Sequence, residues 1–363
     1  MSRVALPDFP WDSLAEVKAT ASAHPGGMVD LSIGTPVDPV PAGIRDALAS
    51  VSEIPGYPTT HGIPALRAAA IAALGRRHGV TGIEPDAVLP TIGSKEAVAW
   101  LPRLLGFGPG DLVVIPELAY PTYEVGALLA GASILRADST VALGPQRPAM
   151  IWLNSPSNPT GRVLPVEHLR KVVEWARERD VVVVSDECYL ALGWETSPLS
   201  VLHPDVCGGS TEGLIAVHSL SKSANLASYR AGFLTGDPRL IAQLLEIRKH
   251  AGMIVPRPVQ EAMVAALTDD EALAAQRERY ARRRLSLRKA LQDNGFQIDH
   301  SEAGLYLWAT RDEPAAATVE WLADRGILVA PGTFYGPTGG QHVRVALTAT
   351  DERVDAAVER LSQ

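Results

Sequence analysis

The sequence predicts an α/β protein with a large domain, built on a mostly parallel sheet flanked by helices, and a smaller α+β domain. Between about residues 60 and 250, short apolar runs alternate with amphipathic segments, as in the strand–helix units of a parallel sheet. Beyond about residue 268, this alternation gives way to a long charged segment and further strand-like runs. We therefore expect the large domain over residues 46–250, and the small domain over residues 1–45 together with 251–363.

The elements of the large domain are predicted from apolar runs and from the glycine and proline residues that begin or end them. A helix is expected over residues 62–79, ending at Gly79, and a surface helix over residues 165–180, which begin with a proline. Four runs rich in aliphatic residues are expected as buried strands, namely 111–116, 149–154, 181–186 and 214–220.

The small domain is expected to combine helices with strands. A long charged helix is predicted from Asp269 to Asp293, where Asn294 and Gly295 end it. Strand-like runs follow at residues 304–310, 327–332 and 341–350, with a helix over 318–326 and a last helix from Asp351. The turn-rich residues 31–43 are expected to form a loop that lines or crosses the domain junction.

Composition limits the classes of partner. Of 363 residues, 46% are hydrophobic and 20% charged, so we expect a substantial core. The formal net charge of −8 argues against broad binding to nucleic acid or an anionic membrane, because both require clustered positive charge. Two cysteines are too few for a disulfide framework, and no secretion signal or membrane span is evident. We therefore expect a cytoplasmic location.

Polar residues follow three of the predicted strands directly. The run ending at residue 153 leads into Asn154 and Asn158, the next into Asp186, and the last into Lys222. Because ligands of open α/β sheets bind beyond the carboxyl ends of the strands, we expect these side chains to meet in one crevice.

Lys222 lies among Ser219, Ser221 and Ser223, and Arg230 follows eight residues later. An amine beside hydroxyl and guanidinium donors suits a cofactor that needs a Schiff-base lysine and a phosphate site. The alternatives are that Lys222 is a surface lysine and that Arg230 forms an ordinary salt bridge.

Asp186, after four valines, could keep a pyridine nitrogen protonated. The alternative is that it caps a helix or binds a metal. No histidine or cysteine cluster has metal-ligand spacing, so no metal is expected.

Further upstream features fit the same site, although each is weak by itself. The prolines and glycine of residues 154–161 fix a turn that directs the Asn158 amide into the crevice, or simply form a turn. Gly93 and Ser94 precede a helix, whose first N–H groups attract anions. Tyr120 offers a ring on which a pyridine could stack, and Tyr189 offers a hydroxyl to its phenolic oxygen.

Taken in order, these motifs resemble the fold-type I, class I/II pyridoxal-phosphate aminotransferases over almost the whole chain. The resemblance implies that Lys222 is the Schiff-base lysine and proton shuttle, Asp186 the partner of the ring nitrogen, and Tyr120 the stacking ring. Asn158 and Tyr189 would meet the phenolic oxygen. The phosphate would be held by Ser94, the Lys95 backbone, Ser219, Ser221 and Arg230.

The same resemblance implies a homodimer with shared active sites and a carboxylate-binding arginine. Tyr57 would reach the phosphate of the neighbouring subunit. Arg344, within the alternating run "HVRVALT", would bind the substrate carboxylate, although from the strand alone it could face solvent. The backbone of Gly34 would approach that carboxylate.

Several stretches, among them "SDECYLALGW" and "HSLSKSANLASYRAGF", are similar to actinobacterial succinyldiaminopimelate aminotransferases. This resemblance implies transfer of an amino group between glutamate and N-succinyl-2-amino-6-oxopimelate. A second cationic contact is then expected, from Arg248, Lys249, Arg257 or Lys95. Transamination of aspartate, aromatic or other amino acids, and β-elimination of sulfur, remain alternatives, as does a non-enzymatic regulator, which the negative net charge disfavours.

Overall fold

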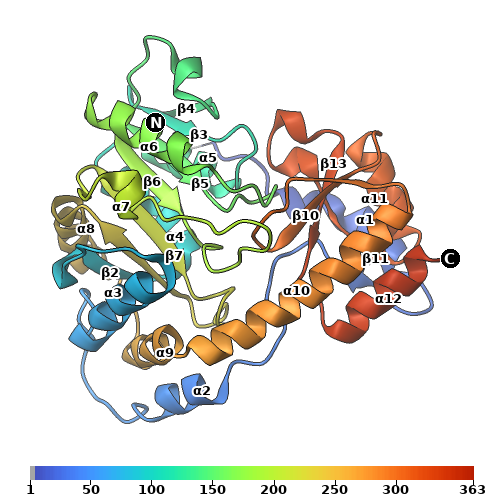
Figure 1. Ribbon diagram of the computed structural model, residues 1–363, viewed down its shortest axis with the longest axis horizontal. Coiled ribbons are helices and arrows are strands. Elements are labelled where there is room, and N and C mark those ends of the chain that lie inside the picture. Colours follow the sequence, from blue (N-terminus) through green and yellow to red (C-terminus); the bar gives the residue numbers. More distant parts are fainter. Residues whose placement is uncertain (1–4) are drawn as a thin grey trace.

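A seven-stranded sheet forms the centre of the larger unit in the computed structural model, which describes residues 5–363 (Figure 1). Its strand order is β2-β8-β7-β6-β5-β3-β4, and β8 is antiparallel to both of its neighbours while the other pairs are parallel. The strands are β2 (Val88–Ile92), β3 (Leu112–Ile115), β4 (Ser133–Arg136), β5 (Met150–Asn154), β6 (Val182–Asp186), β7 (Leu214–Ser219) and β8 (Ala231–Gly236).

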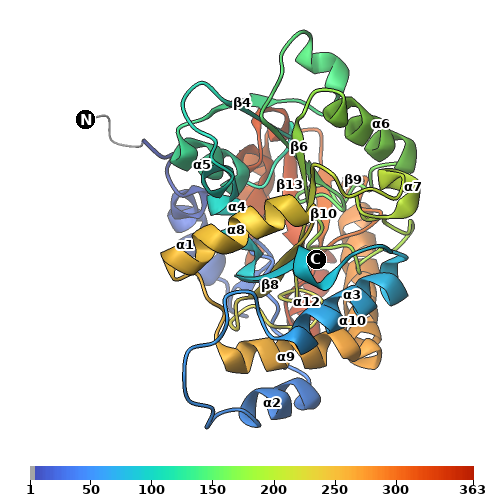
Figure 2. The same ribbon diagram turned by 90° about the vertical axis from the view of Figure 1, so that its left-hand side faces the viewer.

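Helices cover both faces of this sheet. On one face lie α4 (Gly93–Leu104), α5 (Thr122–Ala130) and α8 (Pro238–Ala251), and on the other lie α3 (Pro64–His78), α6 (Val166–Arg177), α7 (Pro204–Cys207) and α9 (Arg257–Thr268) (Figure 2). The strands alternate between the two cores. Ile151 and Leu153 pack on the α6 side, whereas Met150 and Trp152 pack on the α4 side. Burial on both faces explains why the strands are continuous apolar runs.

The smaller unit is built on an antiparallel sheet of order β12-β13-β10-β9, beside a parallel pair of β1 with β11. Its strands are β1 (Val29–Asp30), β9 (Gln297–Asp299), β10 (Tyr306–Thr310), β11 (Ile327–Leu328), β12 (Ala330–Pro331) and β13 (His342–Ala346). Its helices are α1 (Ala15–Ser22), α10 (Asp270–Asp293), α11 (Ala315–Ala323) and α12 (Asp351–Leu361). The long α10 runs from beside α9 into this unit (Figure 1).

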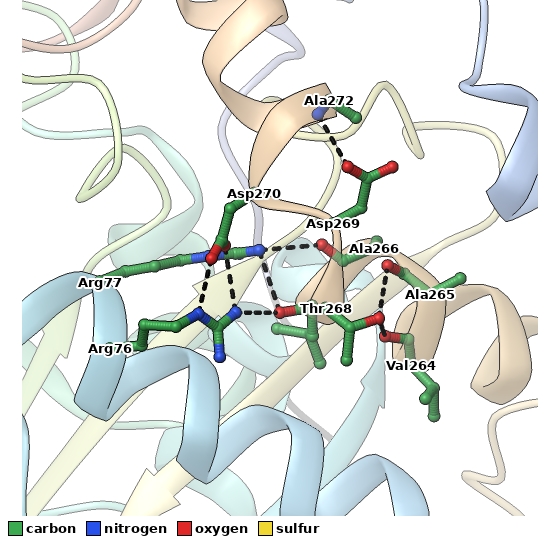
Figure 3. A network of polar contacts seen from close by, with 10 residues as sticks. Arg76, Arg77, Val264, Ala265, Ala266, Thr268, Asp269, Asp270 and Ala272 are labelled. Atoms are coloured by element: carbon green, nitrogen blue, oxygen red, sulfur yellow. Dashed lines mark hydrogen bonds and ion pairs between the residues drawn. The ribbon is translucent and has the colours of Figure 1, made fainter.

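An ion-pair cluster fixes the corner between α9 and α10. The guanidinium groups of Arg76 and Arg77, at the end of α3, both bind the Asp270 carboxylate at 2.6 Å (Figure 3). They also donate to the carbonyl oxygens of Ala266 and Leu267, which the end of α9 leaves without intrahelical partners. The cluster therefore connects the end of α3 to the end of α9 and the start of α10.

Most expected elements are confirmed in type and place, but the run 327–332 forms two short strands, β11 and β12, which belong to different sheets. The first predicted helix ends at His78, and Gly79 follows with a φ of +66°. The long charged helix begins at Asp270, directly after its N-cap Asp269. The predicted domain limits stay a prediction, although Ile44 of α2 (Ala42–Ala49) and Ala262 of α9 belong to the core of the large unit. Among residues 5–363, no helix is long and apolar enough to cross a membrane.

Candidate active site

A cavity of about 890 Å³ lies at the carboxyl ends of β5, β6 and β7, where the two units meet. The strand register brings the ends of β5, β6 and β7 side by side, because Asn154 is paired with Asp186 and Asp186 with Val217. All but one of the predicted site residues line this cavity, namely Gly34, Ser94, Lys95, Tyr120, Asn158, Asp186, Tyr189, Ser219, Ser221, Lys222, Arg230 and Arg344.

Lys222 projects into the cavity from the connection between β7 and β8. This connection reverses the chain, so that Ser219 comes to lie opposite Gly232. The Lys222 Nζ atom donates a hydrogen bond of 2.6 Å to the carbonyl oxygen of Gly34, in the loop after β1. Burial lowers the pKa of the Lys222 ammonium, because desolvation disfavours its charged form. A larger fraction of this amine is then neutral, and the neutral form is the one that acts as a nucleophile or accepts a proton.

Asp186 ends β6 as a buried carboxylate. Its Oδ2 accepts a hydrogen bond of 2.8 Å from the Tyr123 hydroxyl, and its Oδ1 accepts one of 3.2 Å from the backbone N–H of Cys188. Burial raises the pKa of Asp186, since desolvation disfavours the charged form. No lysine, arginine or histidine of residues 5–363 forms an ion pair with this carboxylate. A protonated pyridine nitrogen in the cavity would supply the missing positive charge.

The start of α4 and the side chain of Arg230 form an anion site. Gly93 begins the helix with a φ of +72°, and a Cβ atom there would lie 2.3 Å from Nη2 of Arg230. Only glycine therefore permits this close approach. Free backbone N–H groups at the helix start, the guanidinium, and the hydroxyls of Ser219 and Ser221 are the donors that a phosphate requires.

Arg344 is buried in the floor of the cavity with 2% of its surface exposed. Val343 and Val345 pack in the core of the small unit, so the alternation of β13 turns Arg344 the other way. Its guanidinium donates to Asn158 Oδ1 at 2.9 Å and to the Ser32 carbonyl at 2.6 Å. Within residues 5–363 it forms no ion pair with a carboxylate, which leaves its charge for an anionic ligand.

Three tyrosines complete the wall of the cavity, and two of them were missed in the sequence. The hydroxyls of Tyr189 and Tyr306 lie 3.0 Å apart, within hydrogen-bond distance. Tyr306 gave no signal, because it lies within the apolar run of β10. Tyr123 lies in the first turn of α5, three residues after Tyr120, and this short separation in the sequence was the only available clue.

Tyr57 and three of the four candidates for a second cation lie outside the cavity. Tyr57 lies outside the cavity with 99% of its surface exposed, and its contact with a neighbouring subunit stays a prediction. Of the four candidates for a second cation, only Lys95 lines the cavity, with its Nζ 5.6 Å from the centre of the Phe9 ring. The others pair with carboxylates, Arg248 with Glu96, Lys249 with Glu246, and Arg257 with Glu261.

Comparison with known proteins gives one consistent family. The family model "Aminotransferase class I and II" matches residues 27–361. A probable aminotransferase of Mycobacterium tuberculosis is 66% identical over 99% of this chain and 86% of that protein. The 4-dedimethylamino-4-oxo-anhydrotetracycline transaminase of Streptomyces rimosus is 58% identical over 98% of this chain and 99% of that protein.

A solved structure extends the likeness to three dimensions. The probable N-succinyldiaminopimelate aminotransferase of Thermus thermophilus is 29% identical, with a TM-score of 0.86, over 97% of this chain and 99% of that one. The cavity independently contains an amine, a buried carboxylate with which no cation of residues 5–363 forms an ion pair, and an anion site beside Gly93. On these grounds the chain belongs to the class I and II aminotransferases and is a pyridoxal-phosphate-dependent transaminase.

Proposed function

We propose that this enzyme is the N-succinyl-LL-2,6-diaminopimelate:2-oxoglutarate aminotransferase of lysine and diaminopimelate biosynthesis. The observation that carries the proposal is a second cation in the cavity. Besides Arg344, the ammonium of Lys95 lines it, and among residues 5–363 that ammonium forms no ion pair with a carboxylate. A substrate with an α-carboxylate and a distal carboxylate or succinyl group matches two separate positive charges.

The surroundings of each residue suggest its role in binding the cofactor or in transferring a proton. Bound pyridoxal phosphate supplies an electron sink for the negative charge left when the substrate Cα–H bond is broken. Asp186 would hold the ring nitrogen, and Asn158 with Tyr189 the phenolic oxygen. Lys222, whose pKa is lowered by burial, would accept the proton from the substrate Cα and return it during the reaction.

Substrate orientation would depend on Arg344. Its guanidinium is held by Asn158 and the Ser32 carbonyl, so its position is fixed before a substrate arrives. A preorganised guanidinium binds a carboxylate in a bidentate manner without a further loss of side-chain freedom. Glutamate and 2-oxoglutarate, each with an α-carboxylate and a distal carboxylate, suit the same two cations as the succinylated substrate. We propose them as donor and acceptor, in a cytoplasmic homodimer.

A second candidate is transamination of a fused-ring ketone. The relative from Streptomyces rimosus has such a compound in its name and is 58% identical. An aromatic wall of this cavity supports the idea. The rings of Phe9 and Trp11 lie 5.5 Å apart and those of Trp11 and Phe334 5.4 Å apart, and all three residues line the cavity. Aromatic surfaces of this kind favour planar, apolar substrates.

The test is a single-turnover absorbance screen of the cofactor-loaded enzyme with amino donors. We expect glutamate to convert the pyridoxal form to the pyridoxamine form, and N-succinyl-2-amino-6-oxopimelate to convert it back. The variant Lys95→Gln should raise KM for the succinylated substrate about tenfold, whereas the control Lys249→Gln, outside the cavity, should not. Conversion back only by 4-dedimethylamino-4-oxo-anhydrotetracycline would favour the second candidate. Pyruvate release from cystathionine would instead indicate a lyase.

A further inference from the structure

Two buried polar groups lie behind the cofactor cavity and have no role in the scheme above. Glu187 follows Asp186 directly, and His218 comes immediately before Ser219. Their exposed fractions are 2% and 6%. Glu187 Oε2 and His218 Nε2 are 3.8 Å apart, and within the described part of the chain neither atom has a hydrogen-bond partner.

The surroundings of these two atoms leave room for a third partner. A separation of 3.8 Å is too long for a direct hydrogen bond. A small cavity of about 50 Å³ is lined by both residues, together with His78, Cys188 and Ser219. One water molecule needs about 10–15 Å³ of such space and at least two polar partners. Buried polar atoms without partners are rare, and each one destabilises the folded state.

We propose that a buried water molecule bridges the protonated Glu187 carboxyl group to Nε2 of His218, and that this neutral unit positions Asp186. Glu187 Oε2–H donates to the water, and the water donates to His218 Nε2. The second part of the proposal rests on the proposed role of Asp186 toward the ring nitrogen. The small cavity shares the lining residues Arg77, His78, Leu190 and Ala191 with an outer pocket of about 420 Å³, so the two pockets are neighbours, and we infer that water enters from the outer one.

The electrostatics of the site favour the neutral forms. Burial raises the pKa of Glu187 to about 7, and the neighbouring Asp186 carboxylate adds to this effect. Burial lowers the pKa of His218 to about 3, and His78 contributes in the same direction. The other titratable or charged groups lining the small cavity are Cys188 and Arg77. An ionised Glu187 would place a second negative charge beside Asp186, which desolvation disfavours.

Glu187 is well placed to fix the segment that carries Asp186. Its Oε1 accepts a hydrogen bond of 2.7 Å from the Val201 N–H, and its own N–H donates to the Val217 carbonyl at 2.9 Å. Three residues of the same short segment, Asp186, Cys188 and Tyr189, line the cofactor cavity. Loss of the Glu187 carboxyl group would keep the backbone hydrogen bond to Val217 but remove the side-chain hydrogen bond to Val201. Glu187 is therefore a positioning residue.

The experiment compares Glu187→Gln with Glu187→Leu in the cofactor-loaded enzyme. Glutamine keeps the polar groups without a charge, so we expect a near wild-type kcat and an unchanged pH midpoint of the cofactor absorbance. Leucine should lower kcat about tenfold, as is typical when a supporting hydrogen-bond partner is lost. It should also raise the pH midpoint, because a ring nitrogen held less firmly by Asp186 carries less positive charge.

Controls make the outcome decisive. Glu246→Gln, on the surface of α8, should behave as the wild type in both measurements. If Glu187→Leu does not fold, His218→Phe replaces it, since phenylalanine keeps the stacking on Phe233, whose ring centre lies 4.8 Å away. The absorbance titration uses no substrate, so failure of the proposed substrate leaves it unaffected. A wild-type midpoint for Glu187→Leu, a loss with Glu187→Gln equal to that with Glu187→Leu, or a crystal structure without this water would overturn the proposal.

Discussion

Asp186 receives its hydrogen bonds from two different parts of the chain. The Tyr123 hydroxyl reaches Oδ2 from α5, and the Cys188 amide reaches Oδ1 from the segment after β6. The Tyr123 ring is held in turn by stacking on Trp152, with ring centres 4.7 Å apart. A carboxylate held on both oxygens presents a fixed direction to a cationic partner, which is what pairing with a pyridine nitrogen requires.

Tyr123→Phe tests this arrangement at a single atom. Loss of the hydroxyl removes one donor to the buried Asp186 carboxylate while the ring keeps its packing, so we expect kcat to fall about tenfold and the free energy of unfolding to fall by about 1–3 kcal/mol. Tyr335→Phe is the control, because its buried hydroxyl has no hydrogen-bond partner within residues 5–363. Steady-state kinetics of both variants provide the measurement. An unchanged kcat for Tyr123→Phe would show that Asp186 does not depend on this phenol.

Among the elements, the corner between α9 and α10 concentrates charge at helix ends. Asp270 lies in the first turn of α10, where a carboxylate interacts favourably with the helix dipole, and it also binds both arginines at the end of α3 (Figure 3). Hydrogen bonds from Arg76 and Arg77 hold the pKa of Asp270 well below its usual range. The ionised form is therefore the one that stabilises this corner.

The variant Asp270→Asn should lower the free energy of unfolding by about 1 kcal/mol at neutral pH, the upper end for exposed pairs. Because the folded-state pKa is lowered, this contribution is complete above about pH 4, the unfolded pKa, and is lost as the pH falls below it. Urea unfolding at pH 7 and at pH 3 measures the difference. Asp180→Asn, which removes a mostly exposed pair with Arg147, should have a smaller effect. A difference that is the same at both pH values would contradict the ionic explanation.

At the same scale, the reversal after β7 is a feature that the sequence did not reveal. The four apolar runs between residues 111 and 220, and the polar residues at their ends, could be predicted. Buried parallel strands are apolar throughout, whereas the residues that follow them are polar. The direction of β8 could not, since "AGFLTG" carries no sign of its partner strands. Yet this antiparallel strand brings Arg230 back beside Gly93.

For the whole molecule, contacts between residues far apart in the sequence could not be predicted, whereas features of local sequence could. The residues on strand ends of the large unit were found from the sequence. Tyr306 and the pairing of Arg248 with Glu96 were not, because the first depends on how the units dock and the second joins residues 152 positions apart. An arginine considered for substrate binding therefore proves to be buried and paired, which local sequence cannot indicate.

Tyr57 gives a prediction about assembly. If its hydroxyl binds the phosphate of a neighbouring subunit, Tyr57→Phe should weaken cofactor binding about tenfold, the loss of one hydrogen bond to a charged group. Hybrid dimers of Tyr57→Phe with Lys222→Ala chains would then contain one intact site. Activity of the mixture above that of either parent, measured after reassembly of the two chains, would confirm sharing. If the activity of the mixture is only the average of the two parents' activities, Tyr57 acts in its own subunit or in neither.

Reductive trapping of the cofactor tests the central claim most directly. Lys222 has an amine with a lowered pKa, and it lines the same cavity as the anion-site residues and the buried Asp186 carboxylate. Borohydride treatment of the pyridoxal-phosphate-loaded enzyme, followed by peptide mass spectrometry, should therefore place the cofactor mass on Lys222. Lys222→Ala should show no adduct at any lysine. An adduct on another lysine of the wild type, with Lys222 unmodified, would contradict the assignment of this active site.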